Sequence, residues 1–270
     1  MRPTLAAEEL KTNLTQYLST TFALADPPVR EALEKFLNHP ANGIFRGPYL
    51  RIRTPFRPAD EGWRNILEWA PAEPVPYLHQ VQAWRRLSSL DRAPQPTLVT
   101  TGTGSGKTEA FLIPVLDHCR RAKLKNRRGV KAVLLYPMNA LATDQAMRIN
   151  DLLARPELTG VTAGLYIGEA PGTAYARVLT ERSEIRSQQP DILITNYKML
   201  DLLLQRGEDL ALWQDADIGY VVVDEFHTYD GAQGTDVAML LRRLAAATNH
   251  SRPGKPLGQI CPVATSATLG

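Results

Sequence analysis

Cysteine is scarce in this chain of 270 residues, and its two cysteines, Cys119 and Cys261, stand far apart. Two isolated thiols cannot build a disulfide framework, and their spacing does not match that of zinc ligands. We therefore expect both to be reduced thiols of a cytoplasmic protein.

Long apolar runs are also missing. No stretch approaches the ~18 consecutive apolar residues that indicate a membrane-spanning helix. The first residues include Glu8 and Glu9 and lack the apolar segment of a signal peptide. We therefore expect no membrane partner and a cytoplasmic location.

Neither sign of charge dominates, since 31 Lys and Arg residues face 28 Asp and Glu residues, for a formal net charge of +3. This mild basic excess permits nucleic-acid binding without indicating it. A content of 44% hydrophobic and 22% charged residues is ordinary for a globular protein with a sizeable core. Composition therefore leaves the function to the motifs.

Residues 1–74 form a predicted accessory region that differs in character from the rest. Apolar residues recur at helical spacing from Leu5 to about Ser19 and from Val29 to Leu37, with the breaker Asp26-Pro-Pro28 between them. An extended basic segment, Gly43–Phe56, follows, and proline punctuation around residue 74 marks a boundary. We expect a small, mostly helical N-terminal extension.

Residues 75–270 alternate between short apolar runs, loops and helical patterns. The apolar runs predict strands at Thr97–Thr100, Lys131–Tyr136, Val161–Ile167, Ile192–Thr195, Ile218–Val223 and Ile260–Thr265. Helices are predicted at Glu109–Arg121 and from Ala140 to about Leu153. This order indicates an α/β domain whose parallel sheet is flanked by helices and buried on both faces. A ligand should lie at the carboxyl ends of the strands.

A dense basic run spans Arg120–Arg128, with six positive charges in nine residues. It has the composition of a nucleic-acid patch. The helix after Lys107, however, starts at the ligand edge of the sheet and runs away from it. We therefore favour a solvated loop at the opposite edge.

The segment Thr101-Gly-Thr-Gly-Ser-Gly-Lys-Thr108 lies between a predicted strand and a predicted helix. Glycine accepts backbone angles that are closed to other residues, so the loop N–H groups can point at phosphates, and the helix adds its positive N-terminal end. Lys107 supplies a cation for the β- and γ-phosphates of ATP, and the Thr108 hydroxyl is placed for Mg²⁺. The predicted nucleotide contacts are Thr103, Gly104, Ser105, Gly106, Lys107, Thr108 and Glu109.

Two carboxylates, Asp224 and Glu225, follow the apolar run Tyr220-Val-Val-Val223. Adjacent carboxylates at the mouth of a buried strand are costly unless a cation or hydrogen bonds compensate. We predict that Asp224 holds Mg²⁺ through water and that Glu225 orients and polarises the attacking water. The predicted catalytic residues are therefore Glu225, Lys107 and Asp224, and the predicted metal ligands are Thr108 and Asp224.

Together, the glycine loop, Asp224-Glu-Phe-His227 and Thr265-Ser-Ala-Thr268 resemble motifs I, II and III of superfamily 2 DEAD/DEAH-type helicases. Thr101 stands where the first glycine is usual, as helicases often allow. The stretch Tyr136-Pro-Met-Asn-Ala-Leu-Ala-Thr-Asp-Gln145 is similar to motif Ia of a bacterial group that includes MrfA-like repair helicases and the large helicases of anti-phage systems such as DISARM and Druantia. The resemblance covers roughly residues 75–270 and implies a RecA-like P-loop NTPase fold.

The resemblance also implies roles for further residues. Gln80 matches the glutamine that reads the adenine edge, to which its amide offers one donor and one acceptor. The positions that meet the nucleic-acid backbone are matched by Pro137, Asn139, Gln145, Thr195 and Asn196. Coupling of the nucleotide site to a second lobe is assigned to His227, Ser266 and Thr268.

The function implied is that of an ATP-dependent DNA helicase or translocase that uses ATP and Mg²⁺. DNA, single-stranded or with an overhang, is favoured over RNA by the Asp-Glu-Phe-His and Pro-Met-Asn motifs. This chain would be the first RecA-like lobe. The second lobe, which supplies a transition-state arginine, is absent from these residues, so we expect Mg-ATP binding with slow hydrolysis.

The resemblance also implies partner proteins from a defence or repair system. Two alternative functions stay open. One is a nucleotide-switched interaction module, which the retained Glu225 disfavours because pure switches can lose the base. The other is the ATPase part of a restriction or remodelling motor, which Ser266-Ala-Thr268 disfavours.

The lysine of the glycine loop gives the first test. Lys107→Ala removes the cation that faces the β- and γ-phosphates, so we expect Mg-ATP binding, measured by titration calorimetry, to fall at least about tenfold. Unchanged binding would contradict the assignment of the loop.

Overall fold

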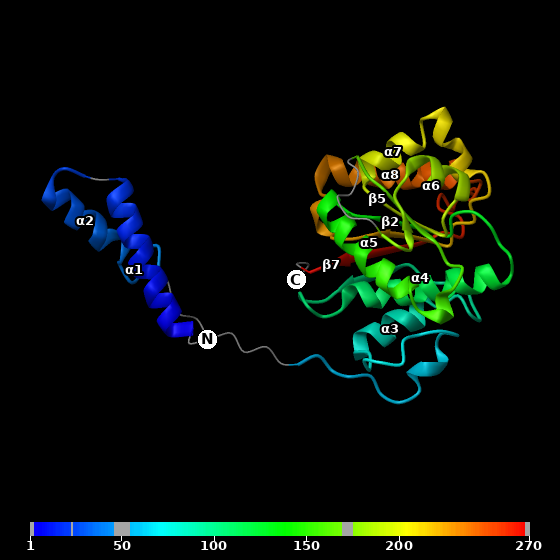
Figure 1. Ribbon diagram of the computed structural model, residues 1–270, viewed down its shortest axis with the longest axis horizontal. Helices are drawn as coiled ribbons and strands as arrows, with labels where there is room; N and C mark the ends of the chain where they lie inside the picture. Colours follow the sequence, from blue (N-terminus) through cyan, green and yellow to red (C-terminus); the bar gives the residue numbers. More distant parts are fainter. Residues whose placement is uncertain (1–2, 23, 46–54, 169–174, 268–270) are drawn as a thin grey trace. The chain divides into compact units, whose positions relative to one another are not determined.

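The structure, a computed structural model, describes residues 3–22, 24–45, 55–168 and 175–267 (Figure 1). The chain divides into two compact units, Met1–Pro55 and Phe56–Gly270. The second unit begins before residue 75 because the segment ahead of that boundary is packed: Trp63, Leu67 and Trp69 are buried in one apolar cluster with Trp84.

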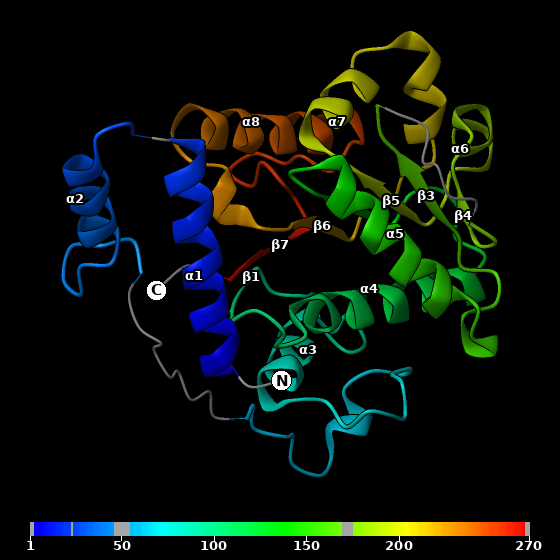
Figure 2. The same ribbon diagram turned by 60° about the vertical axis from the view of Figure 1, so that its left-hand side comes forward.

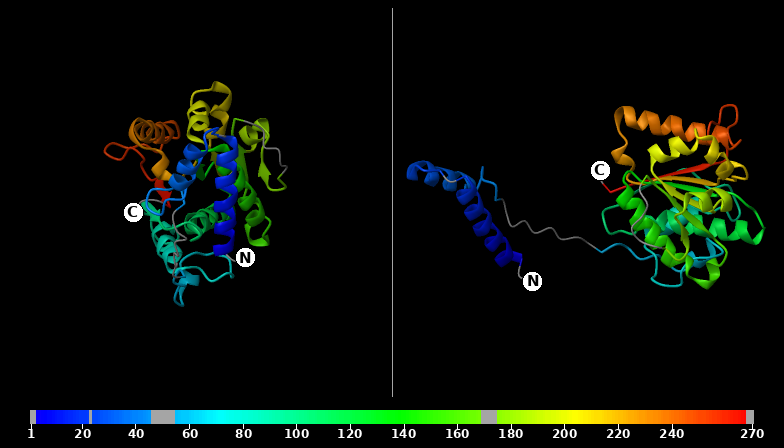
Figure 3. Two further views of the ribbon diagram at one scale, coloured as in Figure 1. Left: turned by 90° about the vertical axis from the view of Figure 1, so that its left-hand side faces the viewer. Right: turned by 45° about the horizontal axis from the view of Figure 1, so that its top comes forward.

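Among its described residues, the first unit contains two helices, α1 (Pro3–Thr21) and α2 (Pro27–Leu37), at the two stretches with helical spacing (Figure 3). Pro27 and Pro28 occupy the first turn of α2, where proline is tolerated. Most of the predicted extended segment, residues 46–54, lies outside the described residues. No helix in the described ranges is long and apolar enough to cross a bilayer.

The second unit is built on a parallel sheet, which has seven strands among the described residues in the order β1-β7-β6-β2-β5-β3-β4. The strands are β1 (Thr97–Thr100), β2 (Ala132–Leu135), β3 (Ala163–Tyr166), β4 (Val178–Leu179), β5 (Ile192–Thr195), β6 (Tyr220–Val223) and β7 (Cys261–Ser266). All six predicted strands are confirmed to within two residues at each end. The edge strand β4 was not predicted, because two residues are too short to stand out as an apolar run.

Helices cover both faces of the sheet (Figures 1 and 2). One layer contains α3 (Leu78–Leu87), α4 (Lys107–Leu124) and α5 (Asn139–Leu153), and the other contains α6 (Arg182–Gln188), α7 (Tyr197–Leu203) and α8 (Gly231–Ala247). Short 3-10 turns complete the unit: η1 (Trp63–Asn65), η2 (Pro156–Leu158), η3 (Gly207–Trp213) and η4 (Phe226–Thr228).

The central strands explain why their sequences read as unbroken apolar runs. Along β6, Val222 joins the apolar cluster under α4 and α5, whereas Val221 and Val223 join the cluster under α7 and α8. Because side chains of a strand alternate between the two faces, a strand covered on both sides needs apolar residues at every position. The predicted α/β architecture with a RecA-like arrangement is thereby confirmed.

The basic run Arg120–Arg128 lies at the end of α4 that is remote from Lys107. Four of its six charges pair within the protein, in the contacts Arg120–Glu68, Arg121–Asp117, Lys123–Asp191 and Arg127–Asp217. Three of these contacts tie α4 and the loop after it to neighbouring segments, and residues 125–128 are exposed.

One of these pairs should be important for stability. The buried carboxylate of Asp117 accepts a hydrogen bond from the Trp69 backbone N–H at 2.9 Å and pairs with Arg121 at 3.0 Å. Burial raises the pKa of Asp117, and the neighbouring Arg121 opposes that rise. Asp117→Ala leaves a nearly buried guanidinium unpaired, so we expect the free energy of unfolding in urea to fall by about 3–5 kcal/mol.

The control is Glu68→Gln. Glu68 pairs with Arg120, which lies on α4 like Arg121, and this pair is more exposed. The substitution should cost less than about 1 kcal/mol. Equal losses for the two variants would contradict the special role of the buried pair.

Candidate functional site

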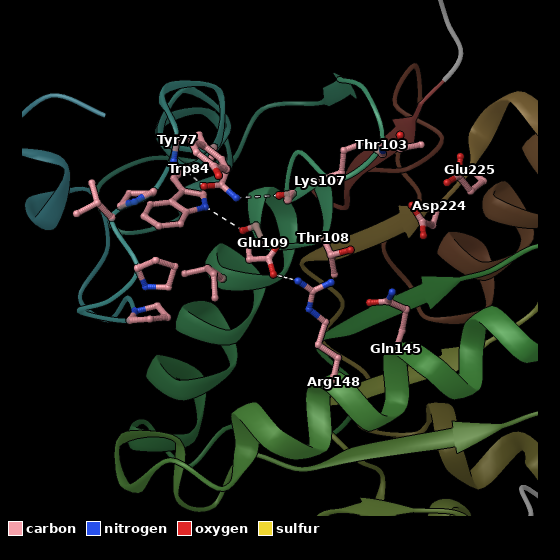
Figure 4. A pocket seen from close by; sticks show the side chains of 18 of the residues that line it. Tyr77, Trp84, Thr103, Lys107, Thr108, Glu109, Gln145, Arg148, Asp224 and Glu225 are labelled. Carbon is pink, nitrogen blue, oxygen red and sulfur yellow. Dashed lines mark hydrogen bonds and ion pairs between the residues drawn. The ribbon is translucent and has the colours of Figure 1, made fainter. Parts of the chain in front are cut away.

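A cavity of about 560 Å³ opens at the carboxyl edge of the sheet (Figure 4). Its walls come from the segment before α3, the glycine loop, the first turns of α3 and α4, one side of α5 and the acidic pair after β6. Ligand sites of small molecules commonly have this size. The cavity thus lies where a parallel sheet places its ligand.

The glycine loop has the backbone that its sequence predicts. Gly104 and Gly106 adopt left-handed angles, with φ of 75° and 73°. The Thr101 hydroxyl hydrogen-bonds the buried Ser105 hydroxyl at 2.6 Å, which gives the threonine at the usual glycine position a role in closing the base of the loop. The Lys107 ammonium donates to the Thr101 carbonyl oxygen at 3.1 Å and so spans the loop.

Helix α3 holds this loop from one side. The His79 ring nitrogen Nε2 lies 2.9 Å from the Ser105 carbonyl oxygen, and the Trp84 indole N–H donates to the Glu109 carbonyl oxygen at 3.0 Å. Burial lowers the pKa of His79, which favours a neutral ring. Sequence reasoning missed both residues, although they flank Gln80, the residue that it did select.

Gln80 is nearly buried, with 6% of its surface exposed, and both ends of its amide are engaged. Its Nε2 donates to the Gly106 carbonyl oxygen at 3.0 Å, and its Oε1 accepts from the Tyr77 backbone N–H at 2.7 Å. Gly106 has a left-handed φ of 73°, which strains any other residue, and a Cβ there would also lie only 2.3 Å from this Nε2. Gln80 thus fixes the loop, and its contact with adenine stays a prediction.

The acidic pair is fastened to β7. The Thr265 hydroxyl donates to Asp224 Oδ1 and lies 3.4 Å from the Glu225 backbone N–H, which donates to it. Burial raises the pKa of Asp224, while the bond from Thr265 and the charge of Lys107 act against the rise. Thr265 was not predicted as a site residue, although it directly precedes the predicted coupling residue Ser266.

The predicted coupling residues also meet here. His227 Nδ1 lies 3.0 Å from the Ser266 hydroxyl oxygen and 3.4 Å from Glu225 Oε2. The histidine therefore connects β7 to the glutamate. Thr268, the third predicted coupling residue, lies outside the described residues.

A separate groove gathers part of the predicted nucleic-acid set. Pro137, Asn139 and Asn196 line it together with Lys198. The Asn196 amide Nδ2 donates to Asn139 Oδ1 at 2.8 Å, and its Oδ1 caps α7 by accepting from the Met199 backbone N–H at 2.8 Å. The two amides thus form one polar unit at the ends of β2 and β5.

The other two residues of that set lie elsewhere. Thr195 is fully buried, and its hydroxyl donates to the Tyr166 carbonyl oxygen at 2.6 Å. Gln145 lines the first cavity, with its Oε1 buried. Six residues on α5 amount to about one and two-thirds turns, so Gln145 faces away from Asn139. Thr195 and Gln145 are therefore not among the residues that line this groove, and their contact with nucleic acid stays a prediction.

Comparison with known families decides the identity of the fold. The model of the DEAD/DEAH box helicase family matches residues 77–270. The chain belongs to the DEAD/DEAH box helicase family. The family match thereby confirms that the motifs of this chain are those of a superfamily 2 helicase.

Among curated proteins, the chain is similar to Druantia protein DruE of Escherichia coli, with 26% identity over an alignment 379 positions long that covers 97% of this chain and 20% of that protein. It is also similar to the uncharacterized ATP-dependent helicase MJ1574 of Methanocaldococcus jannaschii, with 29% identity over 62% of this chain and 23% of that protein. The chain thus spans about a fifth to a quarter of these relatives.

Two solved structures have the same fold. The DUF1998 helicase MrfA bound to DNA and AMPPNP aligns with a TM-score of 0.55 and 26% identity, over 79% of this chain and 27% of that one. The helicase Lhr of Mycobacterium smegmatis bound to ssDNA and AMP-PNP gives a TM-score of 0.56 and 25% identity, over 72% and 23%.

The bond between Thr265 and Asp224 predicts a pH effect. Only the ionised carboxylate can serve Mg²⁺, so Mg²⁺-dependent nucleotide binding should be lost as the pH falls through the raised pKa of Asp224. Thr265→Val removes a bond that stabilises the ionised form, and we expect this loss to move to higher pH. Thr265→Ser keeps the hydroxyl and should behave like the wild type. Coincident pH profiles of the valine variant and the wild type, measured by calorimetry, would refute the coupling.

Proposed function

We propose that this chain is the ATP-binding lobe of an ATP-dependent DNA helicase or translocase. The observation that carries the proposal is the meeting of Lys107 and Thr108 with Asp224 and Glu225 in one cavity. The two pairs follow β1 and β6, which are separated in the sheet by β7 alone. The hydroxyl of Thr265 on β7 joins this arrangement to the acidic pair.

The phosphates would lie over the glycine loop. Lys107 now donates to the carbonyl oxygens of Thr101 and Gly102, at 3.1 and 3.4 Å. Phosphate oxygens are charged and therefore stronger acceptors, so the ammonium would exchange these carbonyls for the β- and γ-phosphates. The N–H groups at the start of α4 add donors on the same side.

The oxygen groups of the cavity fit a magnesium ion. Mg²⁺ prefers hard oxygen ligands and keeps several waters, as the Thr108 hydroxyl and a water-linked Asp224 allow. When bound, it would neutralise charge on the β- and γ-phosphates. Burial raises the pKa of Asp224, and an added cation would counter that rise by favouring the ionised carboxylate.

Glu225 is the residue that we assign to the attacking water. Its side chain is about one-third exposed at the cavity, next to His227. A carboxylate there can orient the water and accept its proton. His227 and Ser266 would transmit conformational changes at this site to a second lobe.

The groove with Pro137, Asn139 and Asn196 is the proposed contact for the nucleic-acid backbone. Its amides can bond phosphates without reading sequence. Similarity to MrfA bound to DNA and AMPPNP, and to Lhr bound to ssDNA and AMP-PNP, supports DNA as the substrate.

A role in anti-phage defence is favoured over repair by the extent of the similarity to DruE. That alignment includes 97% of this chain and thus the N-terminal region, whereas the alignment with MJ1574 covers 62%. Since this chain matches only about a fifth to a quarter of the length of these relatives, we infer that a second RecA-like lobe elsewhere in the whole protein supplies the transition-state arginine.

The function is tested with Glu225→Gln in the full-length protein. Mg-ATP binding should persist, because the glutamine keeps the shape of the side chain, while DNA-stimulated ATP hydrolysis should fall about 10²–10⁴-fold. The matched control is Glu208→Gln, since Glu208 pairs with Arg186 on the surface of the opposite layer. Undiminished turnover in the Glu225 variant would exclude the assigned base.

A further inference from the structure

The cavity contains a second cation besides Lys107. Among the described residues that line it, Lys107 and Arg148 are the only lysine or arginine. Arg148 comes from α5, where Leu141, Gln145 and Arg148 follow at intervals of four and three and so share one side of the helix. The resemblance to helicase motifs assigned no role to Arg148.

Arg148 is held in place by Glu109. Its Nη2 forms an ion pair with Glu109 Oε1, drawn as a dashed line in Figure 4. Glu109 stands in the first turn of α4, and its carbonyl oxygen accepts the bond from Trp84. The side chains of the pair are 43% and 32% exposed, so the pair bridges two helices at the cavity and is not sealed in the core.

The guanidinium keeps donors for a ligand. It carries five N–H groups, and the contact with one carboxylate oxygen uses only part of them. Burial lowers the pKa of Arg148, but a guanidinium stays protonated in proteins at ordinary pH. Arg148 is therefore a lasting positive charge that faces an anion-binding cavity.

The position of the pair along the cavity indicates which part of a nucleotide it would meet. In Figure 4, Tyr77 and Trp84 lie at one end, Asp224 and Glu225 lie at the other, and Glu109 and Arg148 lie between them. In the proposed nucleotide site, the β- and γ-phosphates would occupy the end with the acidic pair, and the base would occupy the end near α3. The middle then faces the α-phosphate and the ribose.

We propose that Arg148, positioned by Glu109, binds the α-phosphate of the nucleotide and acts as the second cation of the cavity. This inference rests on the proposed nucleotide site. Planar guanidinium donors match phosphate oxygens well, and the negative charge of Glu109 beside a phosphate is offset by the arginine between them. The rival role is a plain brace between α4 and α5, but pairs this exposed stabilise proteins little.

The test is calorimetric binding of Mg-ATP, Mg-ADP and 2′-deoxy-ATP to the 270-residue chain. Arg148→Ala should weaken all three by the same factor, roughly tenfold to a hundredfold. Arg148→Lys should recover part of the loss, because it keeps the charge without the fork. Glu109→Gln should weaken binding less, and should add nothing when Arg148 is already alanine.

The matched control is Arg243→Ala. Arg243 pairs with Asp201 between α8 and α7 at 2.6 Å, and the two side chains are 49% and 41% exposed. This pair thus resembles the one at the cavity but lies in the opposite layer. Its removal should leave all three affinities unchanged. Thermal unfolding of every variant checks that it folds, and if the alanine variant does not, Arg148→Lys and Arg148→Gln provide the comparison.

Several results would overturn the proposal. A loss for ATP but not for ADP would move the contact to the γ-phosphate, and a loss that disappears with 2′-deoxy-ATP would move it to the sugar. Unchanged affinity together with a lower melting temperature would make the pair a brace. A wild-type chain that binds no nucleotide would instead overturn the proposed function. Titration of the wild-type chain alone distinguishes that outcome from the others.

Discussion

The parallel direction of the sheet is the constraint on which the rest of this molecule depends. Because its strands run the same way, the segments that follow β1, β6 and β7 all emerge at one edge. Groups from distant parts of the chain thereby meet: Lys107 and Asp224 line one cavity, and Thr265 bonds the acidic pair. A parallel sheet must also be covered on both faces, which explains both the helical layers and the apolar strand sequences.

The cavity combines parts that are fixed with parts that are free to change partners. His79 and Gln80 hold two successive carbonyl oxygens of the glycine loop, so its backbone is shaped before any ligand arrives. Lys107, in contrast, bonds carbonyl oxygens that a phosphate would replace. Preformed donors lower the entropic cost of binding, and a mobile ammonium allows the bound and empty states to differ. Contacts also run from Glu225 through His227 to Ser266 on β7, and the proposed coupling to a second lobe would use them.

Local patterns in the sequence were sufficient to predict much of the fold and of the candidate site. The glycine loop, the acidic pair and six strands could be predicted because each is encoded by adjacent residues. The features that escaped depend on contacts between distant segments. Trp63 and Trp69 pack into the core cluster of the second unit although they precede the predicted boundary, and Arg148 pairs with Glu109 of another helix. Gln145 lines the first cavity and not the groove with Asn139, because a motif match does not say which side of a helix each residue faces.

The central claim is that the edge shared by β1, β6 and β7 forms one site for a nucleotide and Mg²⁺. The most direct measurement is a calorimetric titration of the 270-residue chain with AMP-PNP, in the presence of Mg²⁺ and in its absence. We expect one binding event per chain that becomes tighter when Mg²⁺ is added, because the glycine loop and Asp224 would act on the same ligand. Binding that does not depend on Mg²⁺, or no binding by the folded chain, would contradict a single site for a nucleotide and Mg²⁺ at this edge.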